Sequence, residues 1–281
     1  VLHVFEDATT GRMCLASGSY DTTIIVWSLD TYERIKVLRG LASFVQSICS
    51  FVDGGAGAGA GGGGAGSTVL ASASWDKTVR LWSVDSGECM AVMEGHTDSV
   101  ESICTFVDGD GNRMLATGSY DTTVRVWDVK RRKCVRVLEG HTWSACAVCM
   151  VWRGRKQLIA SGSGDKTIRL WDAESGECVG VLEGHCGKVL TLAPLSSRQG
   201  NSILASGSTD ESVRVWDVES MACLAVLNGH RDWVYSVSVV EGLPDDSVQL
   251  VSGSWDQTVA VWDVTPFVKQ VGFRKHPSLN V

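Results

Sequence analysis

Short apolar runs separated by small polar residues recur along the whole chain. Between Leu158 and Asp172, the sequence LIASGSGDKTIRLWD holds two apolar runs joined by a tight turn that Asp165 closes. Two strand-like runs joined by a short Gly/Asp turn predict a β-hairpin. The apolar spacing of an amphipathic helix is absent from the chain. The pattern therefore predicts an all-β protein.

This hairpin is repeated six times, and each copy ends in a tryptophan. From the second copy onward, successive tryptophans are 44 to 46 residues apart, and the first gap is longer because a glycine-rich insert (54–67) lies within it. The six tryptophans are Trp27, Trp82, Trp127, Trp171, Trp216 and Trp262. A period of about 40–45 residues, with Gly-His early and Trp-Asp late, is typical of a β-propeller blade.

On these six copies the chain resembles the WD-repeat (Trp-Asp repeat) family of β-propellers over almost its whole length. The resemblance implies a single propeller over residues 1–281, built from four-stranded antiparallel blades. Their expected bounds are about 1–39, 43–94, 98–139, 142–183, 187–228 and 232–273. In the first blade we expect strands at Val1–Glu6, MCLASGS, TIIVW and Arg34–Leu38, and Val268–Phe273 is expected to be the outer strand of the sixth.

The sequence is compatible with two ways of forming the ring. Nothing precedes the first strand of the first blade, so the strand exchange that usually closes such rings is not evident. The chain is therefore expected to be either a six-blade ring or a seven-blade ring lacking one blade. Because it also begins without Met, we expect a fragment of a longer protein. The glycine-rich insert is expected in a hairpin loop, since no Gly-Lys-Ser/Thr follows it to make a phosphate-binding loop.

Charge and hydropathy narrow the classes of partner. The net charge of −7 and the pI near 5.4 do not fit the basic face that nucleic-acid binding requires. No segment has the ~18 uninterrupted apolar residues of a membrane helix. We expect partners that are other proteins or peptides, with no nucleic acid, no membrane insertion, no small-molecule substrate and no cofactor.

Ten cysteines are placed in a way that argues against disulfides. Four of them lie seven residues after a repeat tryptophan, at Cys89, Cys134, Cys178 and Cys223. Equivalent positions on neighbouring blades are too far apart for a disulfide, so these four are expected to be small buried hydrophobes in a reducing compartment. Cys146 and Cys149 lie three apart in an extended run and point to opposite faces, so no metal site is expected there. The protein is expected to be intracellular, in the cytoplasm rather than the nucleus.

Four arginines lie two residues before a repeat tryptophan, at Arg80, Arg125, Arg169 and Arg214. Strand alternation places each arginine on the same face as its tryptophan. We expect their stems to pack along the blade, with the charge at the rim or over the indole. A basic binding stripe is the alternative, and it would need a more basic protein around it.

Serine, histidine and aspartate recur together, as in a hydrolase triad. A nucleophile needs one strained site, and four copies without a G-x-S-x-G turn favour a buried polar network instead. The resemblance implies that these residues hydrogen-bond within each blade. The expected sets are His96, Thr117, Asp121, Trp127; His141, Ser161, Asp165, Trp171; His185, Ser206, Asp210, Trp216; and His230, Ser252, Asp256, Trp262. Leu41 replaces the histidine beside Ser72 and Asp76, which therefore lack that partner, and no Gly-His precedes Ser17 and Asp21. The first two blades are expected to be the least stable.

Aromatic residues gather just before the turn aspartates and just after the Gly-His pairs. Tyrosine and tryptophan are enriched at binding hot spots, so these positions predict a partner-binding rim. Its residues are Tyr20, Trp75, Tyr120, Trp143, Trp233 and Trp255. The alternative is that each ring only shields its own turn.

The predicted function is a non-catalytic protein–protein interaction scaffold that docks partner proteins or peptides on the propeller face. The alternative is a substrate-receptor subunit of a multiprotein complex such as a ubiquitin ligase. An enzyme is not expected, because no unique site stands out among the repeats.

Overall fold

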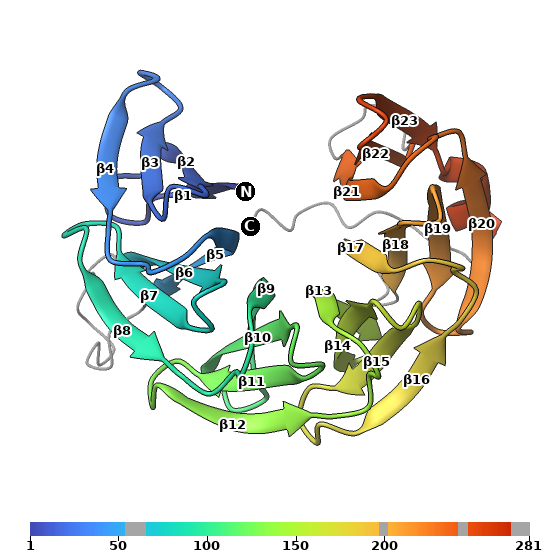
Figure 1. Cartoon of the computed structure of the whole chain (residues 1–281), viewed down its shortest axis with the longest axis horizontal. Coiled ribbons are helices and arrows are strands. Elements are labelled where there is room, and N and C mark those ends of the chain that lie inside the picture. Colours follow the sequence, from blue (N-terminus) through green and yellow to red (C-terminus); the bar gives the residue numbers. More distant parts are fainter. Residues whose placement is uncertain (54–65, 197–201, 241–246, 271–281) are drawn as a thin grey trace. The chain divides into compact units, whose positions relative to one another are not determined.

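A computed structural model describes residues 1–53, 66–196, 202–240 and 247–270 of the chain. In this part of the chain, the strands form six antiparallel sheets in which they follow one another in chain order, and one short helix comes after the last strand (Figure 1). The chain divides into two compact units, residues 1–121 with 125–135, and residues 122–124 with 136–281.

The first unit carries the first two sheets and most of the third. The first sheet holds β1 (Leu2–Glu6), β2 (Met13–Gly18), β3 (Ile24–Ser28) and β4 (Arg34–Leu38). The second holds β5 (Val45–Asp53), β6 (Ser67–Ser74), β7 (Val79–Ser83) and β8 (Cys89–Met93). The third holds β9 (Val100–Val107), β10 (Arg113–Ser119), β11 (Val124–Asp128) and β12 (Lys133–Leu138).

The second unit carries the remaining sheets. The fourth sheet holds β13 (Ala145–Arg153), β14 (Lys156–Ser163), β15 (Ile168–Asp172) and β16 (Cys178–Leu182). The fifth holds β17 (Val189–Ser196), β18 (Ser202–Ser208), β19 (Ser212–Asp217) and β20 (Ala222–Asn228). The sixth holds β21 (Val234–Val240), β22 (Gln249–Ser254) and β23 (Val259–Asp263).

The prediction of an all-β chain built from antiparallel β-propeller blades is confirmed. The expected strands of the first blade are present as β1 to β4. The insert predicted at 54–67 is flanked by β5 and β6, as expected of a hairpin loop, although Ser67 already belongs to β6. Residues 54–65 lie outside the described residues.

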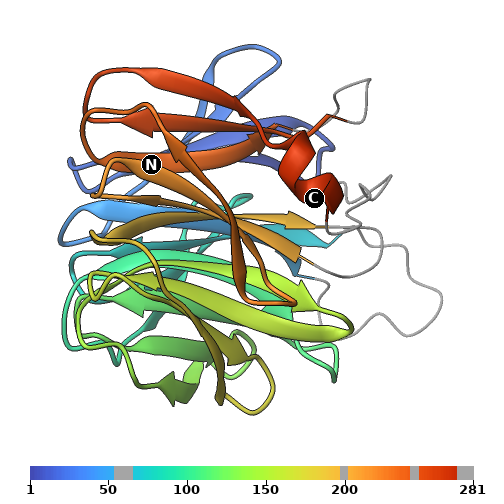
Figure 2. The same cartoon turned by 90° about the vertical axis from the view of Figure 1, so that its right-hand side faces the viewer.

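The expected outer strand of the sixth blade is wrong. The segment Thr265–Gln270 forms the helix α1, drawn as the red coil in Figure 2, and residues 271–273 lie outside the described part of the chain. The Asp263 carboxylate accepts a hydrogen bond from the backbone N–H of Thr265 at 2.9 Å, and Pro266 suits a first helical turn because it has no N–H to satisfy. Val264, just before the helix, and Val268 within it are fully buried in one apolar cluster, and the Val268 backbone N–H donates to the Val264 carbonyl at 3.1 Å.

Neighbouring sheets within each unit pack through faces that are apolar on both sides. Leu170 of the fourth sheet packs with Leu204 and Trp216 of the fifth in one buried cluster. A recurring strand glycine lets the next sheet approach. A Cβ atom at Gly162 would lie 2.6 Å from Val189, and one at Gly207 would lie 2.7 Å from Val234. A side chain at either position would have to displace the valine of the next sheet.

Candidate functional site

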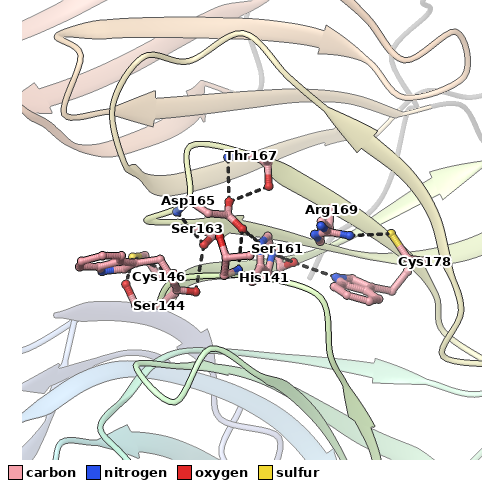
Figure 3. A network of polar contacts seen from close by, with 12 residues as sticks. His141, Ser144, Cys146, Ser161, Ser163, Asp165, Thr167, Arg169 and Cys178 are labelled. Carbon is pink, nitrogen blue, oxygen red and sulfur yellow. Dashed lines mark hydrogen bonds and ion pairs between the residues drawn. The ribbon is translucent and has the colours of Figure 1, made fainter.

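The fourth sheet holds a chain of polar side chains that runs from its turn into its core (Figure 3). The Nδ1 atom of His141 lies 2.8 Å from Asp165 Oδ2, and its Nε2 atom lies 2.7 Å from Ser161 Oγ. Trp171 Nε1 donates to the same Ser161 Oγ at 2.8 Å. Asp165 also accepts hydrogen bonds from the backbone N–H of Thr142 at 3.1 Å and from Thr167 Oγ1 at 2.7 Å.

A neutral imidazole satisfies every member of this chain. The Asp165 carboxylate can only accept, so Nδ1 of His141 donates to it. Nε2 is then an acceptor for the Ser161 hydroxyl, whose oxygen accepts the Trp171 N–H. Burial lowers the pKa of His141, although Asp165 acts in the opposite direction. Burial by itself would raise the pKa of Asp165, but hydrogen bonds from Thr167 and His141 outweigh it and bring that pKa to about 2.

Three further sheets contain the same arrangement with nearly the same distances. In the third sheet His96 lies 2.7 Å from Asp121 and 2.8 Å from Thr117 Oγ1, to which Trp127 donates at 2.8 Å. In the fifth sheet the matching distances among His185, Asp210, Ser206 and Trp216 are 2.8, 2.7 and 2.8 Å. In the sixth sheet those among His230, Asp256, Ser252 and Trp262 are 2.9, 2.7 and 2.7 Å.

A glycine precedes each network histidine, and a side chain at this position would crowd the repeat tryptophan. Gly95 and Gly140 have φ values of +155° and +150°, which glycine adopts at far lower cost than other residues. A Cβ atom at Gly140 would lie 3.2 Å from Nη1 of Arg169 and 3.3 Å from the Trp171 ring. The Gly-His pair therefore lets the backbone pass over the buried indole before the histidine enters the core.

The first two sheets depart from this arrangement. Trp27 and Trp82 still donate to Ser17 and Ser72, at 2.8 and 2.9 Å. Leu41, in place of histidine, is buried in an apolar cluster that includes Trp82.

Asp76 lacks a histidine partner, as expected, but other groups bind its carboxylate. Asp76 accepts a hydrogen bond from the backbone N–H of Ala42 at 3.0 Å, and one from Nη2 of Arg80 at 3.4 Å. The arginine therefore reaches the carboxylate oxygen that histidine binds in the other sheets.

The serine hydroxyls of the apparent triads are closed off from solvent. Ser161, Ser206 and Ser252 each have an exposed fraction of 0%. Each hydroxyl oxygen accepts an indole N–H while its proton faces imidazole Nε2. A nucleophile must reach its substrate, and these three side chains have no surface exposed to solvent.

Two of the four recurring arginines, Arg169 and Arg214, pack against the repeat tryptophans, as one of the two interpretations predicted. The guanidinium carbons of Arg169 and Arg214 lie 6.0 and 5.9 Å from the indole centroids of Trp171 and Trp216. Each also donates a weak hydrogen bond to a recurring cysteine, Arg169 to Cys178 at 3.7 Å and Arg214 to Cys223 at 3.8 Å. Together with Arg125 and Cys134, at 3.9 Å, three of the four periodic cysteines accept a hydrogen bond from a periodic arginine, a role that the sequence did not suggest.

The prediction that these cysteines are buried hydrophobes is wrong. All ten cysteines are free thiols, but Cys89, Cys178 and Cys223 are exposed and Cys134 is half-buried. They lie on the outer strands β8, β12, β16 and β20, where one side of the sheet edge meets solvent. Cys146 and Cys149 both lie on the extended strand β13. Within the described ranges, no three histidine, cysteine or acidic side chains group closely enough to hold a metal ion.

The first unit brings together two of the predicted rim aromatics through a third ring. The centroid of Phe44 lies 4.4 Å from that of Tyr20 and 5.2 Å from that of Trp75. Tyr20 is 68% exposed. Tyr120, on the next sheet, is also exposed, and its backbone N–H donates to Ser99. The sequence interpretation missed Phe44, which lies three residues after Leu41, as Trp233 lies three after His230.

The second unit holds a row of stacked rings on the sixth sheet. The centroid of Trp255 lies 5.0 Å from that of Trp233 and 5.5 Å from that of Tyr235, with interplanar angles of 22° and 3°. The three side chains are 41 to 57% exposed. Tyr235 was missed because it follows the network histidine by five residues, a position that carries no aromatic in the other copies.

Trp143 lies apart from that row and pairs with a cation. The Nζ atom of Lys188 lies 5.6 Å from its ring centroid. A Cβ atom at Gly164 would lie 2.4 Å from the Trp143 ring, so the glycine before this turn aspartate makes room for the indole.

In the described part of the chain, no helix is long and apolar enough to cross a membrane.

Relatives among known proteins match a part of this chain. A nuclear distribution protein PAC1 from Fusarium vanettenii is 34% identical over 109 residues, and nudF 1 from Talaromyces marneffei, also a nuclear distribution protein, is 33% identical over 110. A PAC1 protein from Gibberella zeae is 33% identical over 109 residues. These matches cover 38 to 39% of this chain and 21 to 23% of each relative.

The family comparison covers most of the chain. The WD40 family (WD domain, G-beta repeat) matches residues 34–83, 87–128, 132–172, 176–217 and 221–263. Each matched segment runs from the outer strand of one sheet to the third strand of the next, so the sequence repeat is offset from the sheet. The chain is therefore a member of the WD40 family.

Proposed function

We propose that this protein is a non-catalytic protein–protein interaction scaffold that docks partner proteins or peptides on the ends of the sheets that carry the exposed aromatics. The supporting observation is the row of Trp233, Tyr235 and Trp255, three large rings stacked on one another and 41 to 57% exposed. Contiguous exposed aromatics are costly in water and are the residues that most often dominate binding energy. Tyr20, Phe44 and Trp75 offer a second docking point in the first unit.

The repeated polar network supports the absence of catalysis. WD40 propellers are generally non-enzymatic scaffolds, and here the hydroxyls that could have been nucleophiles are fully buried. We propose that the network only holds each sheet together. The ten free thiols fit the reducing cytoplasm, which we propose as the compartment.

The fungal relatives are named for nuclear distribution, but the match covers only about a fifth of each of them. From this match we infer a scaffold of the same repeat class, with partners of its own. The ubiquitin-ligase alternative receives no support from the structure or from the relatives, and we do not carry it further.

The docking surfaces can be tested unit by unit. Trp75→Ala alters the first unit and Trp255→Ala the second, and partner capture from cell extract would be compared with the unaltered protein by mass spectrometry. We expect each substitution to remove a defined set of captured proteins. Trp152→Ala is the matched control, because Trp152 is 38% exposed but lies near the end of β13. Identical captured sets for all four proteins would contradict the proposal.

A further inference from the structure

A cavity of about 480 Å³ lies in the first unit, between the second and third sheets. It lies where β5 ends at Asp53 and where β9 and β10 meet at the pair Val107–Arg113. The turn aspartates and their aromatics lie at the other end of these strands, where Val45 pairs with Ser74. The cavity is therefore separate from the docking surfaces proposed above, and its volume is typical of ligand sites.

The walls of this cavity are apolar. Phe51, Val69 and Leu81 are at most 5% exposed and form part of the core between the two sheets. Closer to solvent, Met90 and Val107 are 37 and 40% exposed. An apolar side chain entering the cavity would cover this exposed apolar surface, which favours binding.

The mouth of the cavity is cationic, although the chain as a whole is acidic. Arg113, Lys130 and Arg132 line the cavity, with Asp53 as the single lining carboxylate. The carboxylate of Asp108, in the adjoining turn, accepts hydrogen bonds from the lining residue Asn112. The Arg113 guanidinium carbon lies 5.6 Å from the Phe51 ring centroid, so its charge is held at the edge of the apolar wall. Burial lowers the pKa of Arg113, and the nearby Asp53 carboxylate opposes this only in part. A second anion close to Arg113 would offset the cost of this desolvation through charge attraction and hydrogen bonding.

We propose that this cavity binds an acidic peptide segment of a partner protein, with one apolar side chain inserted between the sheets and flanking carboxylates on Arg113, Lys130 and Arg132. The net charge of −7 repels such a segment from the rest of the surface and leaves this mouth as a favourable landing point.

The test uses a fluorescein-labelled hexapeptide, Glu-Asp-Leu-Phe-Asp-Glu, and measures its binding to the full chain by fluorescence anisotropy at low salt. The cavity is altered by Lys130→Glu together with Arg132→Glu, both of which are exposed, so folding is expected to be retained and is checked by circular dichroism. We expect the double variant to bind the peptide at least about tenfold more weakly. The matched control, Arg34→Glu with Arg155→Glu, changes the net charge equally at exposed positions that neither line the cavity nor adjoin a lining residue.

Two further peptides separate the parts of the proposal. Replacing Leu-Phe by Ser-Ser should weaken binding, because the apolar anchor is lost, and a Lys-Arg-Leu-Phe-Arg-Lys peptide should not bind. The proposal is overturned if both double variants bind the acidic peptide equally, if the Ser-Ser peptide binds as well as Leu-Phe, or if the basic peptide binds. Trp75→Ala should leave this binding unchanged, so a failure here is distinguishable from a failure of the rim proposal.

Discussion

At the residue scale, the network histidines supply hydrogen-bond partners to polar groups that are buried inside each sheet. A hydroxyl, an imidazole, a carboxylate and an indole N–H are each costly to bury without a partner. In the fourth sheet each of them finds one, at 2.7 to 2.8 Å. Leu41 shows the alternative solution, because an apolar side chain there leaves no ring nitrogen to satisfy and Arg80 takes the carboxylate instead.

Replacing a network histidine should destabilise the protein. His141→Ala leaves Ser161 and Asp165 without their ring partner inside the sheet, and we expect the free energy of unfolding to fall by about 1–3 kcal/mol. Urea-induced unfolding followed by tryptophan fluorescence measures the change. Thr142→Ala is the control, since Thr142 is exposed and contacts Asp165 through its backbone N–H alone. A His141→Ala protein with unchanged unfolding would show that the network contributes nothing to stability.

The same network predicts how stability depends on pH. Burial lowers the pKa of His141 in the folded state, so below pH 6.5 the unfolded chain binds more protons and the free energy of unfolding decreases. Asp165, with a folded pKa of about 2, adds a further loss as the pH falls from its ordinary pKa near 4 towards 2. Thermal unfolding midpoints should therefore decrease from pH 7.5 to 5.5 and again to 4. The gap between the unaltered protein and His141→Leu should narrow over the same range, and a widening gap would contradict this explanation.

At the element scale, each hairpin depends on its turn as much as on its strands. Asp165 accepts the backbone N–H of Thr167 at 3.0 Å and thereby closes the turn between β14 and β15. The residue between them, Lys166, has a φ of +75°, a left-handed conformation that non-glycine residues rarely adopt. The corresponding residues of the other five copies share it, at Thr22, Lys77, Thr122, Glu211 and Gln257. The turn aspartate therefore stabilises a strained backbone and binds the histidine at the same time.

Equivalent strand positions differ in what covers them, and this predicts unequal effects of one substitution. Val213 pairs with Gly207 and Val259 pairs with Gly253 in the same register, but Val213 is fully buried and Val259 is 71% exposed. Val213→Thr buries a hydroxyl without a partner and should cost about 1–3 kcal/mol. Val259→Thr should change stability by less than about 0.5 kcal/mol. Chemical denaturation of both variants provides the comparison, and equal losses would show that burial does not set the cost.

At the scale of the whole molecule, the two units differ in how many complete networks they hold. The first unit has one, in the third sheet, and the second has three. The networks connect the turn of each sheet to its core, so a sheet without one should open more readily. This difference in local opening arises within each sheet, so we expect it whether or not a partner protein is bound.

Hydrogen exchange measured by mass spectrometry should reveal this difference. We expect backbone amides of β2, β3, β6 and β7 to exchange faster than those of β14, β15, β18 and β19, because the first two sheets lack the histidine bonds. His141→Leu should bring exchange in β14 and β15 closer to that of β6 and β7. Equal protection of all six sheets would mean that the cores between sheets, and not the networks, determine local opening.

The strands, the turns and the members of each network could be predicted from the sequence because their signals are local and repeated. Apolar runs of five to eight residues, a turn aspartate and a following tryptophan recur six times. A strand or turn that is indistinct in one copy can therefore be assigned from the other copies. The helix α1 was missed since it occurs once, and its signal is only Pro266 and the spacing of Val264 and Val268. Phe44 was missed for a similar reason, because its copy lacks the histidine from which the rim positions were counted.

What the sequence by itself determined, then, is the order of strands and turns and which polar side chains bond within a sheet, because these depend on neighbours at fixed separations along the chain. The tertiary structure alone decided which faces are covered. The recurring cysteines look identical in sequence, yet Cys134 is half-buried and Cys178 exposed. The stacking of Tyr235 on Trp255 and the cationic mouth at Arg113 also arise between elements whose distance in space no local pattern encodes. Burial is a property of what packs against a residue, and that is set only when the sheets come together.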